Sequence, residues 1–192
     1  MNVMMFPRML SSHDEGWAWL MRVNPKVIRM YLLYVLPLSL LPPAMLLYTA
    51  SREDGLLLGG VSMRDARILA AEFFVAEMVV VPLMAAVIKR LGEVVEARPT
   101  YHDAFMLAAV VPTPLWLVSL ALFVPSLMFN SLAMAIALFF SGLLIYEGTY
   151  RIFQLDDEGK SIVMAGSILA AGLVAWIALM LIAFVSWSRA IF

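Results

Sequence analysis

The longest uncharged stretch of this chain runs from Ala104 to Tyr146 and contains 43 residues. An α-helix of that length would measure about 65 Å, because each residue adds about 1.5 Å. That is roughly twice the hydrocarbon thickness of a bilayer, so one straight helix does not fit. Val124-Pro125-Ser126 lies near the middle of the stretch, and proline interrupts helices. The sequence therefore predicts two membrane spans joined by a turn at this tripeptide.

Three further apolar segments lie between charged residues. Met30–Ser51 contains 22 uncharged residues, Ile68–Ile88 is apolar apart from two glutamates, and no charge occurs between Lys160 and Arg189. Each segment can supply the ~20 apolar residues of a transmembrane helix. The prediction is an all-α polytopic membrane protein, a bundle of five transmembrane helices in one domain over residues 27–192. The approximate spans are 27–50, 68–90, 103–123, 127–150 and 161–188.

Composition agrees with this class and excludes others. Apolar residues make up 64% of the chain and charged residues 14%, whereas a soluble domain is about a quarter charged. A formal net charge of −1 offers no basic field for nucleic acid. Cysteine is absent, and no phosphate-binding loop or catalytic motif occurs. We therefore expect no enzymatic activity, no cofactor, no metal site and no nucleic-acid partner.

The distribution of cations predicts the orientation, because cytoplasmic loops carry more lysine and arginine. With five spans and the N-terminus inside, nine cations fall on the inner side and four on the outer side. We expect a cytoplasmic N-terminus and a C-terminus on the opposite side. The inner cations are Arg8, Arg22, Lys26, Arg29, Lys89, Arg90, Arg98, Arg151 and Lys160, and the outer ones are Arg52, Arg64, Arg67 and Arg189.

Residues 1–26 form a mixed polar and apolar segment before the first span. The pattern predicts a short N-terminal interfacial helix lying on the inner membrane surface. Docking on a protein partner is the alternative, since methionine-rich surfaces repack easily. The apolar anchors are Trp17, Leu20 and Met21, with Met9 and Leu10 before them.

Several short motifs mark the start, the break or the end of a span. In chain order they are Trp17-x-x-Leu20, Asn24-Pro25, Pro37, Arg98-Pro99, Val111-Pro112-Thr113-Pro114-Leu115, Tyr146-x-Gly148 and Glu158-Gly159-Lys160-Ser161. Their order and spacing resemble the Yip family (Ypt/Rab-interacting membrane proteins), in particular its bacterial YohC-like inner-membrane branch. The resemblance implies five transmembrane helices, a cytoplasmic N-terminus and a bacterial inner membrane. Eukaryotic members bind Rab-type GTPases, but they often carry a longer cytoplasmic N-terminal region, so that role transfers poorly.

Prolines in the first three spans remove backbone hydrogen bonds. The carbonyls that they free must find partners or line a wet cavity. One interpretation is a set of broken helices around a binding site, as in transporters; the other is a set of plain kinks that aid packing. The candidate functional residues of this group are Pro37, Pro112, Thr113 and Pro114.

Two glutamates lie within the second span, and an intramembrane acid is a functional candidate. Glu72 and Glu77 are five residues apart, about 140° around a helix, so they do not share a face. No lysine or arginine lies at the depth of Glu77. We therefore expect Glu77 to face inward, to be neutral, and to share its proton with a hydroxyl or with a carbonyl freed by a proline. Three roles remain open for Glu77. It could hold helices together through a hydrogen bond, form part of a proton or cation pathway, or contact a lipid or a partner.

Polar residues at the span ends favour structural roles. Glu147 is a candidate interface anchor that could pair with Arg151 at i+4. Thr100 or Asp103 is predicted to cap the third span, and His102 beside them has no recognisable metal-ligand spacing.

Small residues recur every four positions in the last two spans, a spacing that lets helices approach closely. We expect these spans to form a tight antiparallel hairpin, with pairing to a second copy as the alternative. The two ridges are Ala133, Ala137 and Ser141, and Ser167, Ala171 and Ala175.

The sequence thus favours a non-enzymatic membrane scaffold that binds membrane lipids or a membrane protein partner, or that forms a homo-oligomer. The alternative is a small transporter or channel that uses Glu77 and the proline-broken helices. Few polar residues lie within the spans, which disfavours a water-filled path.

Overall fold

A computed structural model describes residues 13–52, 62–97, 99–153 and 157–191. These residues contain only helices and their connections, and five helical segments are long and apolar enough to cross a membrane. The predicted five-helix architecture is therefore confirmed. The five segments are Val27–Ala50, Met63–Val94, Tyr101–Phe123, Leu127–Phe153 and Gly159–Ser188.

Three of these segments are continuous helices and two are broken. The continuous helices are α6 (Met63–Val94), α9 (Leu127–Phe153) and α10 (Glu158–Ile191). The first segment consists of α3 (Val27–Met30), η2 (Tyr31–Val35), α4 (Leu36–Ser39) and α5 (Leu41–Ala50). The third consists of α7 (Tyr101–Val110), α8 (Thr113–Val118) and η3 (Ser119–Phe123).

Proline explains where the helices change. The π-helical turn η2 precedes Pro37, α5 begins next to Pro42, and α7 gives way to α8 at Pro112. Each proline lacks the N–H that a continuous α-helix needs. Pro82 differs from these prolines, since α6 runs through it as one helix. The predicted turn at Val124–Ser126 is present between η3 and α9.

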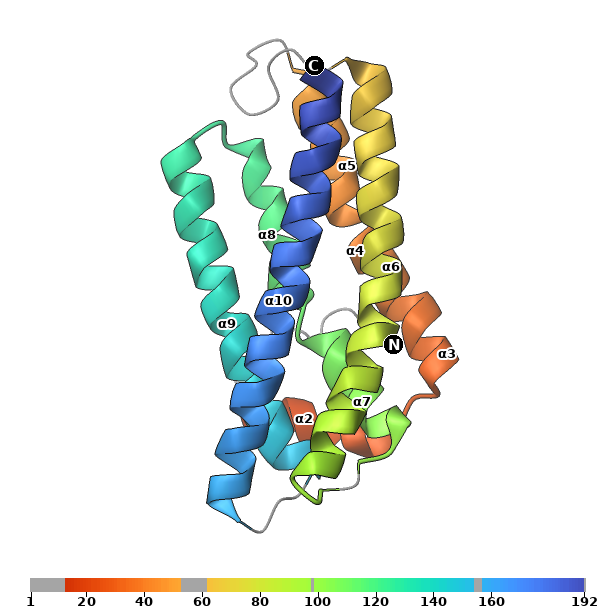
Figure 1. The fold of residues 1–192 in the computed structure, drawn as a ribbon, viewed down its shortest axis with the longest axis vertical. Helices are drawn as coiled ribbons and strands as arrows, with labels where there is room; N and C mark the ends of the chain where they lie inside the picture. Colours follow the sequence, from red (N-terminus) through yellow and green to blue (C-terminus); the bar gives the residue numbers. More distant parts are fainter. Residues whose placement is uncertain (1–12, 53–61, 98, 154–156, 192) are drawn as a thin grey trace.

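The spans alternate in direction, as Figure 1 shows. The C-terminal ends of α6 and α9 and the N-terminal ends of α7 and α10 lie at the lower end, where α2 (His13–Val23) also lies. The turn from η3 to α9 and the C-terminal end of α10 lie at the upper end. An odd number of spans therefore places the two ends of the described bundle on opposite sides.

The core is densest around α7 at the lower end of the bundle. Every residue from Ala104 to Val110 is buried, because the other elements surround this short helix. Phe105 and Leu107 are among its fully buried side chains. By contrast, α10 is largely exposed, with only 6% of its most apolar window buried within the protein.

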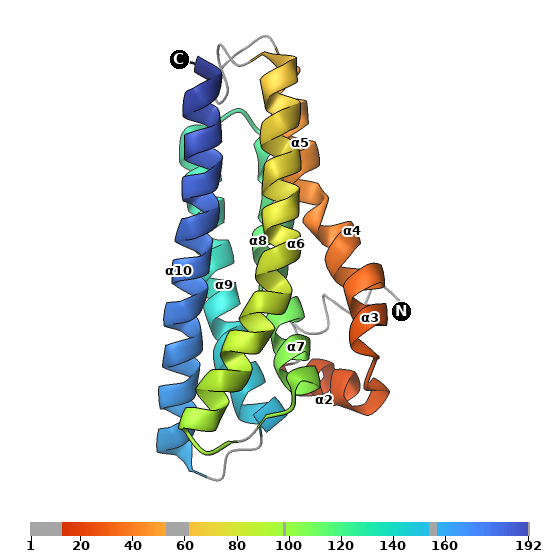
Figure 2. The same ribbon diagram turned by 45° about the vertical axis from the view of Figure 1, so that its right-hand side comes forward.

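The short N-terminal helix α2 lies across the lower ends of the spans (Figure 2). Its Trp17 is 0% exposed and its Leu20 is 4% exposed, and both belong to the main hydrophobic core. The expectation that these two side chains anchor the helix in the membrane surface is therefore wrong. Both side chains pack against the protein instead. Gly148 of α9 lies against the Trp17 ring and leaves room for it. The other predicted anchors Met9 and Leu10 lie outside the described residues.

The C-terminal end of α6 forms a tight reversal. The N–H of Ala97 donates to the carbonyl of Gly92 at 2.9 Å, and Glu96 adopts a left-handed conformation with φ 62°. This is the Schellman arrangement, in which glycine is the usual left-handed residue. Lys160 donates to the Glu96 carboxylate at 2.8 Å and links this end of α6 to α10. Lys160 holds the pKa of the Glu96 carboxyl below its ordinary value through this hydrogen bond and its charge.

Candidate functional site

Glu77 lies near the middle of α6 and faces the interior of the bundle. Its side chain is 6% exposed, and its Oε1 accepts a hydrogen bond from the indole N–H of Trp116 in α8 at 3.1 Å. The other carboxyl oxygen, Oε2, is buried without a hydrogen-bond partner. The prediction that Glu77 faces inward is therefore confirmed.

The predicted partner of Glu77 is corrected by the structure. A hydroxyl or a proline-freed carbonyl was expected, and the partner in the third span is an indole instead. Trp116 is 2% exposed, so its N–H needs an acceptor within the bundle. The Glu77 carboxyl is the acceptor that neighbouring α6 supplies. The sequence could not identify Trp116 as the partner. A single tryptophan in an apolar run does not indicate which neighbouring helix its side chain faces.

Two carbonyls freed by prolines are held by hydroxyl groups. Pro82 has no N–H for the carbonyl of Met78 four residues earlier, and the Tyr31 hydroxyl donates to that carbonyl at 2.9 Å. This bond crosses from the first span to the second. The carbonyl is therefore satisfied by packing rather than by water.

The second example lies in the proline-rich motif of the third span. Pro114 leaves the carbonyl of Val110 without its helical donor, and the Thr113 hydroxyl donates to it at 2.7 Å. The Tyr34 hydroxyl lies 2.8 Å from Thr113 Oγ1. Because the Thr113 proton is used for Val110, Tyr34 is the donor in this pair. The motif thus joins the first and third spans.

A cavity of about 420 Å³ lies beside the Glu77–Trp116 pair. It is lined by residues from all five membrane segments, and nearly all of these residues are apolar. The lining extends from Ala108 and Ile145 beside the core toward Leu122 near the turn from η3 to α9. Cavities of about 300–1,000 Å³ are typical of small-molecule sites. We call this cavity the intramembrane pocket.

The small-residue ridges of α9 and α10 border this pocket. Ser141 in α9 and Ala175 in α10 line it, as do Gly142 and Gly172 beside them. The helices α9 and α10 contact one another, and α10 also packs on α6. Close packing of the two ridges against each other stays a prediction. The Ser141 side chain is 6% exposed, and its Oγ has no hydrogen-bond partner.

The other intramembrane acid lies on a different face, as its spacing predicted. Glu72 is exposed on the outside of α6, and it accepts a hydrogen bond from the Ser186 hydroxyl of α10. It does not line the pocket. Glu72 therefore connects two helices near the upper end of the bundle.

Of the remaining candidate residues, one lines the pocket and the others lie outside its lining. Pro112 lines the pocket, and Pro114 is buried in α8. Pro37 is exposed in α4 and lies away from the pocket. Glu147 is half-buried in α9, and both it and Arg151 have interaction partners. Their pairing with one another stays a prediction.

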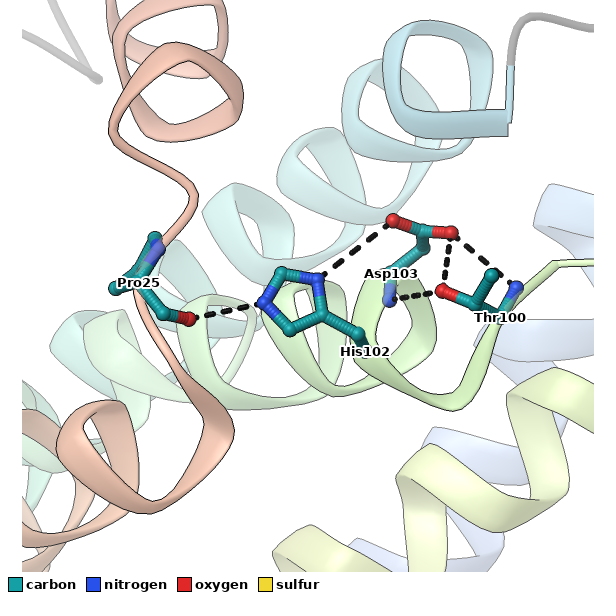
Figure 3. Close-up of polar contacts among 4 residues, drawn as sticks. All are labelled: Pro25, Thr100, His102 and Asp103. Atoms are coloured by element: carbon teal, nitrogen blue, oxygen red, sulfur yellow. Dashed lines mark hydrogen bonds and ion pairs between the residues drawn. The ribbon is translucent and has the colours of Figure 1, made fainter.

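A polar network ties the segment between α2 and α3 to α7 (Figure 3). His102 Nε2 lies 2.9 Å from the carbonyl of Pro25, so this nitrogen carries the proton and donates. Thr100 and Asp103 form a capping box in which each side chain accepts from the other residue's backbone N–H. The predicted cap is therefore confirmed. His102 Nδ1 and Asp103 Oδ1 are 3.8 Å apart.

No group of three or more metal-ligating side chains is assembled within the part of the chain that the structure describes. The chemistry available to the pocket is thus apolar contact with a few hydrogen-bonding oxygens.

Taken together, the fold and pocket define a polytopic helical membrane protein with an intramembrane cavity. Residues 4–179 match the Yip1 domain family. The chain therefore belongs to the Yip1 family, whose members interact within membranes and are not known as enzymes. Comparison of the chain with curated proteins and with solved structures found no match.

Proposed function

We propose that this chain is a non-enzymatic membrane scaffold that holds a lipid chain in its intramembrane pocket. The observation that carries the proposal is the volume of about 420 Å³ with an almost entirely apolar lining. This is nearly three times the volume of an engineered apolar cavity of about 150 Å³ that accepts benzene. Within a bilayer, acyl and isoprenoid chains are the apolar molecules present around such a cavity.

The polar groups near the pocket favour a lipid over an aqueous solute. A transporter path requires polar groups or backbone carbonyls that replace water. Here the carbonyls freed by Pro82 and Pro114 already accept hydrogen bonds from Tyr31 and Thr113. The few polar residues of the lining include Glu77, Ser119, Asn130 and Ser141. A transporter using Glu77 is the second candidate, because this acid lies at the pocket wall.

Filling the pocket tests the proposal. A Cβ built on Gly172 meets no atom within 4 Å, so Gly172→Leu projects a side chain into the pocket that this glycine lines. Gly166→Leu is the matched control, because Gly166 lies on the same helix, is equally uncrowded and is outside the pocket lining. The purified chain is placed in vesicles with a photoactivatable fatty-acyl phospholipid, and labelled peptides are mapped by mass spectrometry.

We expect labelling of pocket peptides in the unmodified chain and in the Gly166 variant, with strong loss in the Gly172 variant. Equal labelling of all three proteins would contradict a lipid in the pocket. Flux of ions or protons across the same vesicles, abolished by Glu77→Gln, would instead favour the transporter.

We also propose the cellular setting. The cation distribution supports a cytoplasmic N-terminus and a periplasmic C-terminus, and the family motifs support the YohC-like branch in a bacterial inner membrane. Residues 1–26 then form the cytoplasmic segment and residues 27–192 the membrane domain. The exposed α10 is the candidate surface for a protein partner or a second copy. Reporter fusions at both ends that signal from the same side would contradict the orientation.

A further inference from the structure

We propose that the turn between α2 and α3 binds the headgroups of anionic phospholipids at the membrane surface. The turn and its flanks, residues 22–29, are called the basic elbow. The elbow carries three exposed cations, Arg22, Lys26 and Arg29, and no aspartate or glutamate occurs from residue 16 to residue 52. This inference concerns a different surface from the intramembrane pocket, and it does not depend on the lipid proposed there.

The elbow cations are not neutralised by a neighbouring acid within the described part of the chain. No ion pair among those residues includes Arg22, Lys26 or Arg29. Asp103, next to His102, accepts hydrogen bonds from the N–H and the hydroxyl of Thr100 instead. Three like charges within one short segment repel each other. An anionic partner is therefore the complement that this surface lacks.

The depth of the elbow is fixed by contacts on both of its sides. Before the turn, the buried Trp17 holds α2 against the protein core. Within the turn, the carbonyl of Pro25 accepts a hydrogen bond from His102 at the start of α7. The first and third membrane segments begin at Val27 and Tyr101, directly after these two contacts. The cations are consequently held at the end of two spans, where a bilayer has its headgroups.

Exposed aliphatic side chains continue from the elbow into the first span. Ile28, Leu32 and Leu33 are each at least half exposed. The surface thus has cations at the membrane border and an apolar stretch immediately beyond them. A phospholipid has the same order, an anionic headgroup followed by an acyl chain. An acidic protein segment would match the cations but not the aliphatic side chains beside them.

The cations are close enough together to act on the same small group of headgroups. Arg22 and Lys26 are four residues apart, so their Cα atoms lie within about 14 Å of each other. An arginine guanidinium can donate two parallel hydrogen bonds to a phosphate. Because the chain on both sides of the turn is held by the core, little order is lost on binding. Each cation near an anionic surface should raise the affinity about fivefold.

The experiment compares two phospholipid probes that differ in headgroup charge. The full chain is placed in phosphatidylcholine vesicles with a trace of photoactivatable phosphatidylglycerol or, separately, of photoactivatable phosphatidylcholine. Both probes carry the diazirine at the same acyl position near the headgroup. Peptides are mapped by mass spectrometry after pepsin digestion, because removal of lysine and arginine would alter tryptic cleavage. We expect the anionic probe to label the elbow peptide at least about fivefold more, with the preference falling at high salt.

Two variants with the same change in net charge separate the elbow from the chain as a whole. The elbow variant combines Arg22→Gln, Lys26→Gln and Arg29→Gln. The matched control removes three cations of α6, with Arg64→Gln, Arg67→Gln and Lys89→Gln. The elbow variant should lose the preference for the anionic probe, and the control should keep it. Thermal unfolding in detergent checks that both variants fold.

The single variant Lys26→Gln carries the test if the triple elbow variant does not fold. It should reduce the preference about fivefold. Equal labelling of the elbow by the two probes in the unmodified chain would overturn the inference, and it would favour an acidic protein segment as the occupant. A preference that survives removal of the elbow cations would overturn it as well, because the anionic lipid would then be held by other residues.

Discussion

Gly148 of α9 lies directly against the ring of Trp17 of α2. A Cβ built on this glycine would be 2.8 Å from two atoms of the indole ring, and it would also clash with Leu107. Real Cβ atoms do not approach other atoms so closely. This contact is what allows a fully buried tryptophan to fix α2 across the ends of the spans.

Gly148→Ala should therefore destabilise the protein by about 1–3 kcal/mol, because a rigid ring must move to admit one methyl group. Thermal unfolding in detergent measures the effect. Gly166→Ala is the control, since nothing lies within 4 Å of its added Cβ and alanine favours helix. A Gly148 variant that melts like the control would show that Trp17 is loosely packed.

Tyr31→Phe should cost about 1–3 kcal/mol, because it leaves the Met78 carbonyl buried without a donor. Pro82→Ala restores the helical N–H to that carbonyl. In the Pro82→Ala background, the tyrosine substitution should therefore cost much less. Unfolding of the two single variants and the double variant measures this coupling. An equal cost in both backgrounds would contradict the role assigned to Tyr31.

Glu77→Gln should retain the fold, because an amide oxygen can still accept from the Trp116 indole. Glu77→Leu should lose about 1–3 kcal/mol through the unsatisfied N–H. Adding Trp116→Phe to the leucine variant removes that donor and should recover part of the loss. Melting temperatures decide between these outcomes. A glutamine variant as unstable as the leucine one would mean that charge matters, and it would favour the transporter.

The Glu96–Lys160 pair predicts a pH dependence with a definite sign. Lys160 lowers the pKa of Glu96 in the folded chain, so the pair adds stability above the ordinary glutamate range, near pH 4.3. This stability should be lost as the pH falls through the lowered pKa. The melting temperature of Glu96→Gln should lie slightly below that of the unmodified chain at pH 7, and the two should converge in acid and at high salt.

Glu93→Gln is the matched control for this pair, because Glu93 pairs with Arg90 on the same helix and links no second element. A pH-independent difference between Glu96→Gln and the unmodified chain would contradict the electrostatic account.

The number of membrane helices could be predicted from the sequence because it depends on segment length and charge alone. The 43-residue stretch required a turn, and Pro125 marked its position. Capping by Thr100 and Asp103 was also predictable, because a cap depends on residues three positions apart. The placement of Glu72 and Glu77 on different faces of α6 followed from helical geometry in the same way.

Contacts between distant segments could not be predicted this way. Trp17 looked like a membrane anchor because an amphipathic helix has the same pattern whether it packs on lipid or on protein. The pocket that α9 and α10 border was not predicted, for a related reason. A ridge of small residues permits a close approach between two helices, but small side chains equally leave room for a cavity beside the helices. Trp116 as the partner of Glu77 required knowledge of both helices together.

The pocket wall includes residues of α10, such as Gly172 and Ala175, and α10 is the fifth span in the chain. Chains are synthesised from the N-terminus, so the four earlier spans are made before this wall exists. The pocket is consequently complete only after α10 has joined the four earlier spans. An intermediate that lacks α10 has Glu77 and Trp116 but lacks this wall of the pocket beside them.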